Sequence, residues 1–257
     1  MTDPARDIRS QVRDRRARLE RASRPTIELL VPARSRLRRG GRLGVFPASF
    51  NPVTRAHVEI ISRARADHQL EEMLLLPSLT NADKTAYEAS LEDRLALLLV
   101  ACGDDPAISL GIASHPFFVD LLPPLNELYD HPQIFFIMGS DTLVRVLDKE
   151  GHYYRRYHRS YRDRLEPLVE LFAASQILVA TRTPFANEDL DRWLDGPEAA
   201  FRPRIHLLEL PEDVRGISAS AVRQRIRQGE PITSLVPPAV ERYLTEHNLY
   251  GSGSPRG

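Results

Sequence analysis

The sequence predicts an α/β protein built on a doubly wound parallel sheet, with a helical C-terminal part. Short apolar segments typical of strands alternate with segments in which apolar residues recur at helical spacing. Such alternation produces a parallel sheet with helices on both faces. The chain has 257 residues, 42 % of them hydrophobic, which suffices for one core and one main domain.

The expected elements begin at residue 42. Residues 42–46 form a short apolar strand, and residues 58–68 form a helix in which Val58, Ile61 and Ala64 repeat at helical spacing. Further strands are expected at 71–78, 108–114, 133–141, 175–182 and 204–211, and further helices at 91–105, at 121–131 and after residue 218.

Two inserts interrupt this alternation. Residues 148–165 are rich in Tyr and Arg, and residues 184–204 contain the only Trp, Trp193. In an alternating α/β fold, inserts usually lie above the carboxyl ends of the strands, where ligands bind. The first insert is therefore a candidate lid, whereas the second could be a surface excursion.

The first forty residues differ in charge from the rest. Lys and Arg balance Asp and Glu at 35 each, but residues 1–40 hold twelve Arg against five acidic residues, a net of +7. Residues 5–22 favour a helix, which Pro25 ends. We expect a basic, partly helical and poorly packed extension over 1–40, a domain over 41–251 and a disordered tail over 252–257. An Arg-rich segment of this kind could bind RNA or an acidic lipid surface. A solvated extension is favoured, because no aromatic residue is interleaved for base stacking.

The composition excludes several classes of protein. Cys102 is the only cysteine, which rules out an internal disulfide and a multi-cysteine metal site. No stretch approaches the roughly 18–20 apolar residues of a membrane span, and the N-terminus has no apolar signal core. We expect a cytoplasmic protein with no membrane partner.

The loop after the first strand, GVFPASFNPVTRAH, carries the most chemistry. Asn51 and Pro52 favour a turn, and a helix begins near Ala56 or His57. The amide groups and the positive dipole end at a helix start bind anions. Thr54 and His57 are three residues apart, so a hydroxyl and an imidazole can reach one point and suit phosphate oxygens. A cap or surface role for His57 is the alternative.

A second phosphate motif lies in GISASAVRQRIRQGE. Ser218 suits a helix N-cap, and Ser220 and Arg223 fall on the first turns of the helix. Hydroxyls, amides and a guanidinium that can grip two oxygens favour phosphate binding. The alternative is a capped surface helix with basic residues.

Three residues elsewhere suit a nucleotide. Gly139 ends an apolar strand and would let a nucleotide approach, and Asp141 can accept from ribose hydroxyls. The chain uses Arg 33 times and Lys only twice. Lys84 therefore favours a site that needs a compact ammonium, such as one that reaches triphosphate oxygens, with an ordinary surface position as the alternative.

Both motifs resemble those of the T/HxGH nucleotidyltransferase superfamily. FNPVTRAH at residues 50–57 resembles its signature, with Thr54 for the first His and Ala56 for the usual Gly. ISASAVR at residues 217–223 resembles its ISSTxxR motif, in the family's order along the chain. The ending, with LVP and HNLY, resembles the nicotinamide/nicotinate mononucleotide adenylyltransferase family. The run GSDTLVRVLDKEGHYY is most similar to a fungal, Pof1-like branch.

The resemblance implies a Rossmann-like fold of the nucleotidyltransferase type. It also implies transfer of AMP from ATP to nicotinamide or nicotinate mononucleotide, with release of pyrophosphate. The implied catalytic residues are His57, Thr54, Lys84 and Arg223. The implied ATP-binding residues are Ser49, Phe50, Asn51, His57, Gly139, Asp141, Ile217, Ser218, Ser220 and Arg223.

Mg²⁺ would enter with the triphosphate, so no acidic metal cluster of the protein is expected. Homo-oligomers are common in the family, which allows one here. Arg94 also matches a family helix position, although a solvated helix face explains it more simply.

The expected acceptor pocket departs from the pattern of the family. A Ser/Thr-Tyr-Thr stretch usual in the bacterial nicotinate branch is replaced by HPFFVD at residues 115–120. Phe117, Phe118, Tyr153 or Tyr154 could stack on the pyridine ring, although aromatic residues are also typical of a core.

Two other classes of function stay open. One is an adenylyltransferase for phosphopantetheine or FMN, or a cytidylyltransferase, although phosphopantetheine enzymes are shorter and lack the C-terminal tail. The other is a non-catalytic nucleotide- or RNA-binding protein, with Ala48, Ala56 and Ala219 as signs of lost activity.

Overall fold

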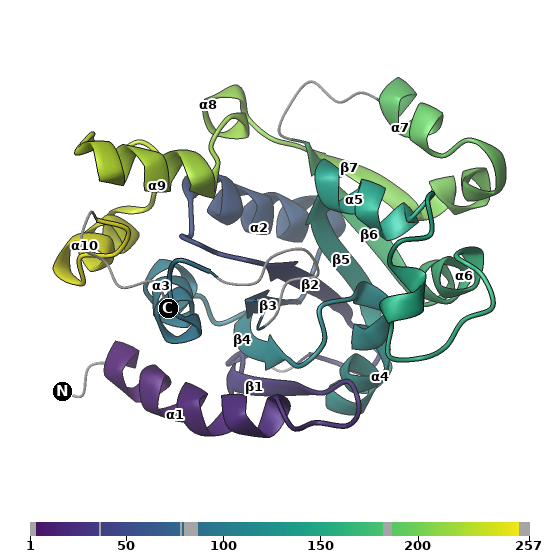
Figure 1. Cartoon of the computed structure of the whole chain (residues 1–257), viewed down its shortest axis with the longest axis horizontal. Helices are drawn as coiled ribbons and strands as arrows, with labels where there is room; N and C mark the ends of the chain where they lie inside the picture. Colours follow the sequence, from purple (N-terminus) through teal and green to yellow (C-terminus); the bar gives the residue numbers. More distant parts are fainter. Residues whose placement is uncertain (1–3, 36, 78, 80–86, 182–186, 252–257) are drawn as a thin grey trace.

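The structure is a computed structural model that describes residues 4–35, 37–77, 79, 87–181 and 187–251 (Figure 1). A seven-stranded sheet with the order β1-β4-β3-β2-β5-β6-β7 forms its centre. The strands are β1 (Ile27–Val31), β2 (Arg42–Ala48), β3 (Glu72–Pro77), β4 (Ile108–Ala113), β5 (Gln133–Gly139), β6 (Ser175–Thr181) and β7 (Ile205–Glu209).

The predicted doubly wound fold is confirmed. From β2 to β7 all neighbouring strands pair in parallel. The chain runs from β2 outwards through β3 to β4, then returns to the other side of β2 at β5 and continues to β7. The strand order thus reverses between β2 and β5, which is where ligands bind in such sheets. Only β1, at the edge of this sheet, is antiparallel to its neighbour, β4.

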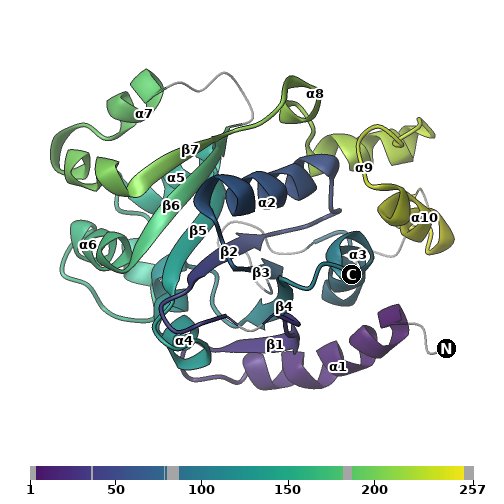
Figure 2. The same ribbon diagram turned by 180° about the vertical axis from the view of Figure 1, so that it is seen from behind.

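Helices cover both faces of the sheet (Figures 1 and 2). One apolar cluster joins α1, α2, α3, α9 and α10 to the sheet, and the other joins α4, α5, α6 and α7. None of the helices in the described part is both long and apolar enough to cross a bilayer. The helices are α1 (Pro4–Leu19), α2 (Arg55–His68), α3 (Leu91–Cys102), α4 (Phe118–Leu128), α5 (Ser140–Leu147), η1 (Tyr154–Arg156), α6 (Leu165–Ala174), α7 (Asn187–Trp193), η2 (Gly196–Arg204), α8 (Glu212–Arg215), α9 (Ala219–Gln228) and α10 (Pro238–Glu246).

Strand β3 shows why the central strands are continuous apolar runs. Met73 and Leu75 belong to the cluster on the α2 face, and Leu74 and Leu76 belong to the cluster on the opposite face. Successive side chains of a strand point to opposite faces, and both faces are covered here. Each position must therefore be apolar, which makes such strands easy to recognise in the sequence.

The expectation of a poorly packed extension over residues 1–40 is wrong. Ile8, Val12 and Leu19 of α1 are buried in the core, where α1 packs along α3. Residues 27–31 form β1, which adds an edge strand to the sheet. The few apolar residues of this segment are spaced so that they share one face of the helix, and a low apolar content conceals that arrangement.

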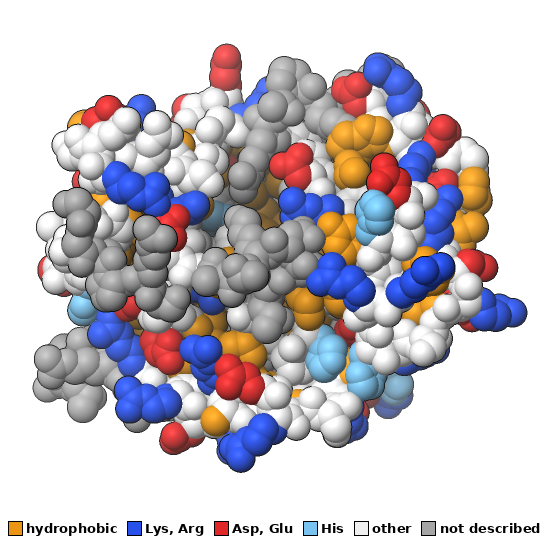
Figure 3. Space-filling view, viewed as in Figure 1, with side chains coloured by type: hydrophobic (Ala, Val, Ile, Leu, Met, Phe, Trp, Pro, Cys, Tyr) orange, Lys and Arg blue, Asp and Glu red, His pale blue; other side chains and the backbone are white. Residues whose placement is uncertain are grey.

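The basic charge of the N-terminal segment is largely paired within the chain. Arg9 pairs with Asp93, Arg16 with Glu20, Arg18 with Glu28 and Arg24 with Glu127. On the face of the molecule drawn in Figure 3, basic and acidic side chains are interspersed. On this face, the basic side chains therefore do not form a continuous surface.

The second insert is packed more closely than a surface excursion. Leu190, Leu194 and Phe201 are buried, and the Phe201 ring stacks on Phe172 with 4.6 Å between centroids. This part of residues 184–204 thus extends the core on the α6 face. Residues 184–186 and the tail 252–257 lie outside the described residues.

Candidate active site

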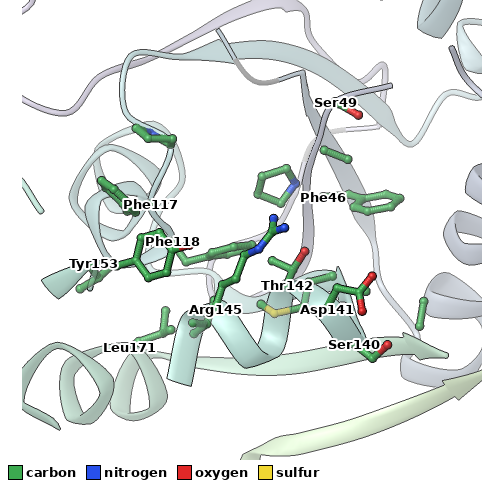
Figure 4. Close-up of a pocket in the computed structure, with 18 of the residues that line it drawn as sticks. Phe46, Ser49, Phe117, Phe118, Ser140, Asp141, Thr142, Arg145, Tyr153 and Leu171 are labelled. Atoms are coloured by element: carbon green, nitrogen blue, oxygen red, sulfur yellow. The ribbon is translucent and has the colours of Figure 1, made fainter. Parts of the chain in front are cut away.

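A cavity of about 330 Å³ opens where the strand order reverses, at the carboxyl ends of β2 and β5 (Figure 4). One side is formed by the end of β2 and the start of α2, and the other by α4, α6 and the first insert. The side chains that line it include Phe46, Ser49, His57, Phe117, Phe118, Gly139, Ser140, Asp141, Thr142, Arg145, Tyr153, Tyr157, Leu168 and Leu171.

The start of α2 orients His57. Thr54 is the N-cap, and its hydroxyl oxygen accepts from the His57 amide at 3.4 Å. The Thr54 amide donates in return to His57 Nδ1 at 3.0 Å, which closes a capping box. Because Nδ1 accepts this hydrogen, the neutral ring carries its own hydrogen on Nε2. The imidazole thus takes part in the helix cap and also lines the cavity. Its Nε2–H is the donor that remains for a ligand.

Thr54 itself does not reach the cavity beside His57, contrary to the sequence-based expectation. Its side chain is buried, and its hydroxyl lies 2.9 Å from His57 Nδ1. The hydroxyl is used to hold the helix start and the imidazole, so Thr54 acts on the cavity through His57.

Phe50 and Asn51 are also buried behind the loop and do not line the cavity. The Phe50 ring lies 5.2 Å from His57 and 5.3 Å from Phe46 between centroids. Phe50 has φ +46°, a left-handed conformation that costs a non-glycine residue about 1–3 kcal/mol and is typical of functional loops. Both residues were expected to contact ATP, but here they support the His57 ring and the loop backbone.

Three distant side chains hold this loop. Arg94 on α3 donates to the Ser49 carbonyl at 3.0 Å, and Arg223 on α9 donates to the Asn51 carbonyl at 2.7 Å. The Tyr250 hydroxyl donates to Asn51 Oδ1 at 2.6 Å. The loop is therefore fixed by α3, by α9 and by the C-terminal segment together.

Arg94 is not a solvated surface residue. Its side chain is fully buried, with the guanidinium 4.0 Å from the centre of the Tyr87 ring. Burial lowers the pKa of Arg94. A buried guanidinium is costly unless it is hydrogen-bonded, so its bond to Ser49 is structurally important.

The second motif lies beside the first. Ser218 caps α9 and accepts from the Ala221 amide at 3.1 Å, while Ile217 is buried in the core. Ser220 Oγ accepts from Arg223 at 3.4 Å. The Arg223–Asn51 bond joins the two motifs, although none of these residues lines the cavity itself.

Glu88 is a partner of Arg223 that the sequence did not reveal. Arg223 Nε donates to Glu88 Oε1 at 2.8 Å, and Arg227 pairs with the same carboxylate. Burial alone would raise the pKa of Glu88, but the hydrogen bonds from Arg227 and Arg223 outweigh it and lower the pKa. An anion therefore already sits at the predicted phosphate motif.

The strand β5 supplies the expected Gly139, and Asp141 follows it. A side chain at Gly139 would meet nothing within 4 Å, so this glycine leaves open space at the cavity wall. Asp141 is exposed on the first turn of α5 and lines the cavity, as Figure 4 shows. Lys84, the remaining predicted catalytic residue, lies outside the described residues.

An aromatic wall forms the other end of the cavity. Phe117, Phe118 and Tyr153, which the sequence offered for the pyridine ring, line it, whereas Tyr154 does not and accepts through its hydroxyl from Arg155. Tyr157, which the sequence did not single out, packs against Phe117 with 4.7 Å between ring centroids.

Two buried carboxylates hold the insert that carries this wall. Asp148 accepts from the amides of Tyr153 and Tyr154 at 3.0 and 2.9 Å. Asp120 on α4 accepts from the His158 amide at 3.2 Å, and burial raises its pKa. The polar backbone of the insert is thus satisfied by side chains at its base.

Arg145 is a further cavity residue that the sequence did not indicate. It lines the cavity from α5, a helix absent from the expected elements, one turn after Asp141. A spacing of four residues from Asp141, the residue that the sequence offered for the ribose, is the signal that could have found it, once a helix was assumed there. Among the described residues, no group of three or more His, Cys, Asp and Glu could hold a metal.

The fold and the cavity define a nucleotide-binding α/β protein with a doubly wound sheet. A family model described as cytidylyltransferase-like matches residues 45–225, and the chain belongs to this family.

Named relatives cover most of the chain. A "probable nicotinate-nucleotide adenylyltransferase" of Carboxydothermus hydrogenoformans is 27 % identical over 216 residues, which cover 82 % of this chain and 98 % of the relative. A protein of the same description from Saccharopolyspora erythraea is 28 % identical over 217 residues, covering 81 % and 89 %.

A solved structure has the same fold. The nicotinic acid mononucleotide adenylyltransferase of Plasmodium falciparum complexed with NaAD matches with a TM-score of 0.58 at 16 % identity, over 82 % of this chain and 97 % of the other. The α/β fold of the nucleotidyltransferase type is therefore confirmed.

Proposed function

We propose that this protein transfers the AMP part of ATP to the phosphate of nicotinate mononucleotide, forming nicotinate adenine dinucleotide and pyrophosphate. The observation that carries the proposal is the cavity at the reversal of strand order. It places His57 at a helix start, Asp141 after β5 and an aromatic wall around one space. The relatives whose names contain this activity supply the choice of acceptor.

The reaction needs no covalent intermediate on the protein. An oxygen of the acceptor phosphate attacks the α-phosphorus of ATP and forms the new P–O bond. The bond from the α-phosphorus to the oxygen that bridges to the β-phosphate breaks, and its electron pair leaves with pyrophosphate. The acceptor phosphate is already ionised at neutral pH, so catalysis consists of positioning and charge stabilisation.

The nucleotide end of the cavity suits the triphosphate. We assign His57 Nε2–H and the amides at the start of α2 to the α- and β-phosphates. Ser218, Ser220 and Arg223 would take the β- and γ-phosphates, after Arg223 has exchanged the Glu88 carboxylate for phosphate oxygens. We also assign assistance at the triphosphate to Lys84.

The remaining assignments concern the sugar, the acceptor and the metal. Asp141 would accept from the ATP ribose, and the wall of Phe117 and Tyr153 would stack on the pyridine ring. Mg²⁺ would enter on the triphosphate oxygens. We propose a cytoplasmic location on the basis of these substrates.

The decisive experiment is release of pyrophosphate by the full-length protein with ATP and Mg²⁺. Nicotinate mononucleotide, nicotinamide mononucleotide, phosphopantetheine and FMN are compared as acceptors, and the product is identified by mass spectrometry. We expect rapid release with nicotinate mononucleotide. Release with phosphopantetheine or FMN alone would replace the proposed acceptor, and no release with any acceptor would favour a non-catalytic nucleotide-binding protein.

A further inference from the structure

Arg145 is a cavity residue that the proposed mechanism does not use. It follows Asp141 by four residues on α5, so the two side chains share one face of the helix, about 6 Å apart along its axis. Figure 4 shows the Arg145 side chain reaching into the cavity, with Phe117 and Tyr153 on one side and Asp141 on the other. Arg145 thus lies between the expected ribose site and the aromatic wall.

Arg145 carries one of the few charges that line the cavity. Among the described residues that line this space, it is the only Arg or Lys, and Asp141 is the only Asp or Glu. The aromatic end is otherwise formed by side chains without charge, such as Phe117, Phe118 and Tyr157. Arg156 lies 5.7 Å from the ring centroids of both Phe117 and Tyr153 but does not line the cavity, so an anionic group on a ring stacked against that wall would meet Arg145 from within the cavity.

We propose that Arg145 binds the ring carboxylate of the acceptor and so selects nicotinate mononucleotide over nicotinamide mononucleotide. This inference rests on the proposed function and names the residue that sets its substrate. A guanidinium pairs with both oxygens of a carboxylate. A carboxamide offers one acceptor oxygen and turns an NH₂ donor towards the other guanidinium donor.

The other anions of the two substrates have different partners. The triphosphate is assigned to the start of α2 and to Arg223, on the side of the cavity formed by the loop after β2. Arg145 comes from α5, next to the wall that suits the pyridine ring. The acceptor phosphate must lie against the α-phosphorus that it attacks, on the side of His57. The ring carboxylate is then the remaining anion, and it would lie on the side of Arg145.

The test compares acceptor selectivity in three variants of the full-length protein. Arg145→Gln removes the charge, Arg145→Lys keeps it without the bidentate geometry, and Arg155→Gln is the matched control. Arg155 lies in the insert that follows α5, contacts Tyr154 and does not line the cavity. The readout is the ratio of kcat/KM for nicotinate mononucleotide to kcat/KM for nicotinamide mononucleotide, at saturating ATP.

We expect Arg145→Gln to lower this ratio about tenfold or more, the loss typical of one charge-assisted hydrogen-bonded pair. Arg145→Lys should recover part of the ratio, and Arg155→Gln should leave it unchanged. An equal fall for both acceptors would overturn the inference, because Arg145 would then serve the common phosphate. An unchanged ratio in Arg145→Gln would overturn it as well.

Calorimetric binding of each mononucleotide, with a non-hydrolysable ATP analogue present, separates this inference from the proposed function. If the protein turns over neither acceptor, the proposed function fails. A binding preference for nicotinate mononucleotide that Arg145→Gln abolishes would then still support the carboxylate site. Binding of neither mononucleotide would overturn both.

Discussion

The two ends of the cavity are held in place by different kinds of contact. At the nucleotide end, residues 46–57, the loop backbone is fixed by side chains from distant parts of the chain, namely Arg94, Arg223 and Tyr250. At the acceptor end, the insert 148–165 is held by carboxylates that accept from its amides, Asp148 and Asp120, and by the ion pairs of Lys149 with Asp195 and of Arg164 with the buried Glu198.

This difference matches the chemistry that we propose for each end. The nucleotide end would bind ATP and stabilise charge in the transition state, which requires donors fixed before the substrate arrives. Long-range, buried contacts provide that rigidity. The acceptor end would recognise one particular ring, and an insert between α5 and α6 can vary without disturbing the central sheet. Substitutions at the two ends should therefore have different effects.

The largest expected effect is at the nucleotide end. His57→Ala removes the donor that we assign to the α- and β-phosphates, and kcat should fall about 100-fold or more. The variant also loses half of the capping box, which costs about 1 kcal/mol of stability and should leave the protein folded. Steady-state release of pyrophosphate measures the first effect, and thermal unfolding measures the second.

Thr54→Ser is the control for this variant. It keeps the hydroxyl that accepts from the His57 amide, so both kcat and the unfolding temperature should stay close to their original values. A kcat for His57→Ala within a few-fold of the unchanged protein would contradict the assignment of His57.

The second prediction compares one arginine from each end. Arg94→Met leaves the Ser49 carbonyl without its donor and removes the guanidinium from the Tyr87 ring, and we expect the free energy of unfolding to fall by about 2 kcal/mol. Arg155→Met, in the exposed insert, should change it by less than about 0.5 kcal/mol. Urea unfolding followed by circular dichroism measures both. Equal losses in the free energy of unfolding would contradict the difference that we infer between the two ends.

Most of the fold could be predicted from the sequence because the central strands are buried on both faces. The apolar run within residues 133–139 is typical of a strand covered on both sides by helices. Strand β1 was missed because its five residues lie within an Arg-rich segment whose average composition is that of a solvated extension. The burial of α1 was missed for a similar reason, since three apolar side chains suffice to attach that helix.

The candidate site was predicted where local sequence determines local structure. A strand, a turn and a helix start place His57 at the cavity, and a strand end places Asp141 there. The orientation of Phe50 depends on packing by residues far away in sequence, which no local pattern contains. Arg145 was missed because its importance depends on which walls surround it, a property of the folded chain.

The third prediction concerns the anion that Arg223 holds at the nucleotide end. Glu88 pairs with Arg223 and Arg227. In the arrangement that we propose, it must leave Arg223 before the triphosphate binds there, so it would compete with ATP. Glu88→Gln weakens this competition, and the KM for ATP and the Kd of a non-hydrolysable analogue should fall about threefold, or roughly 0.6 kcal/mol. Glu230→Gln, which removes the partner of Arg225 on the same helix, should leave both constants unchanged. Weaker ATP binding in Glu88→Gln would instead mean that Glu88 positions Arg223.

The smallest expected effect concerns the base of the acceptor end. Burial raises the pKa of Asp120, so its ionised form is less favourable in the folded protein than in the unfolded one. As the pH rises through the folded pKa, stability is lost; as the pH falls through it, the folded state takes up a proton and stability returns.

Asp120→Asn removes this charge and keeps an oxygen that can accept from the His158 amide. At pH 7 we expect the free energy of unfolding of Asp120→Asn to equal that of the unchanged protein or to exceed it by about 1 kcal/mol or less. The difference should shrink towards pH 4 in urea unfolding at several pH values. If Asp120→Asn is instead less stable than the unchanged protein at pH 7, the Asp120 carboxylate holds the insert through its charge.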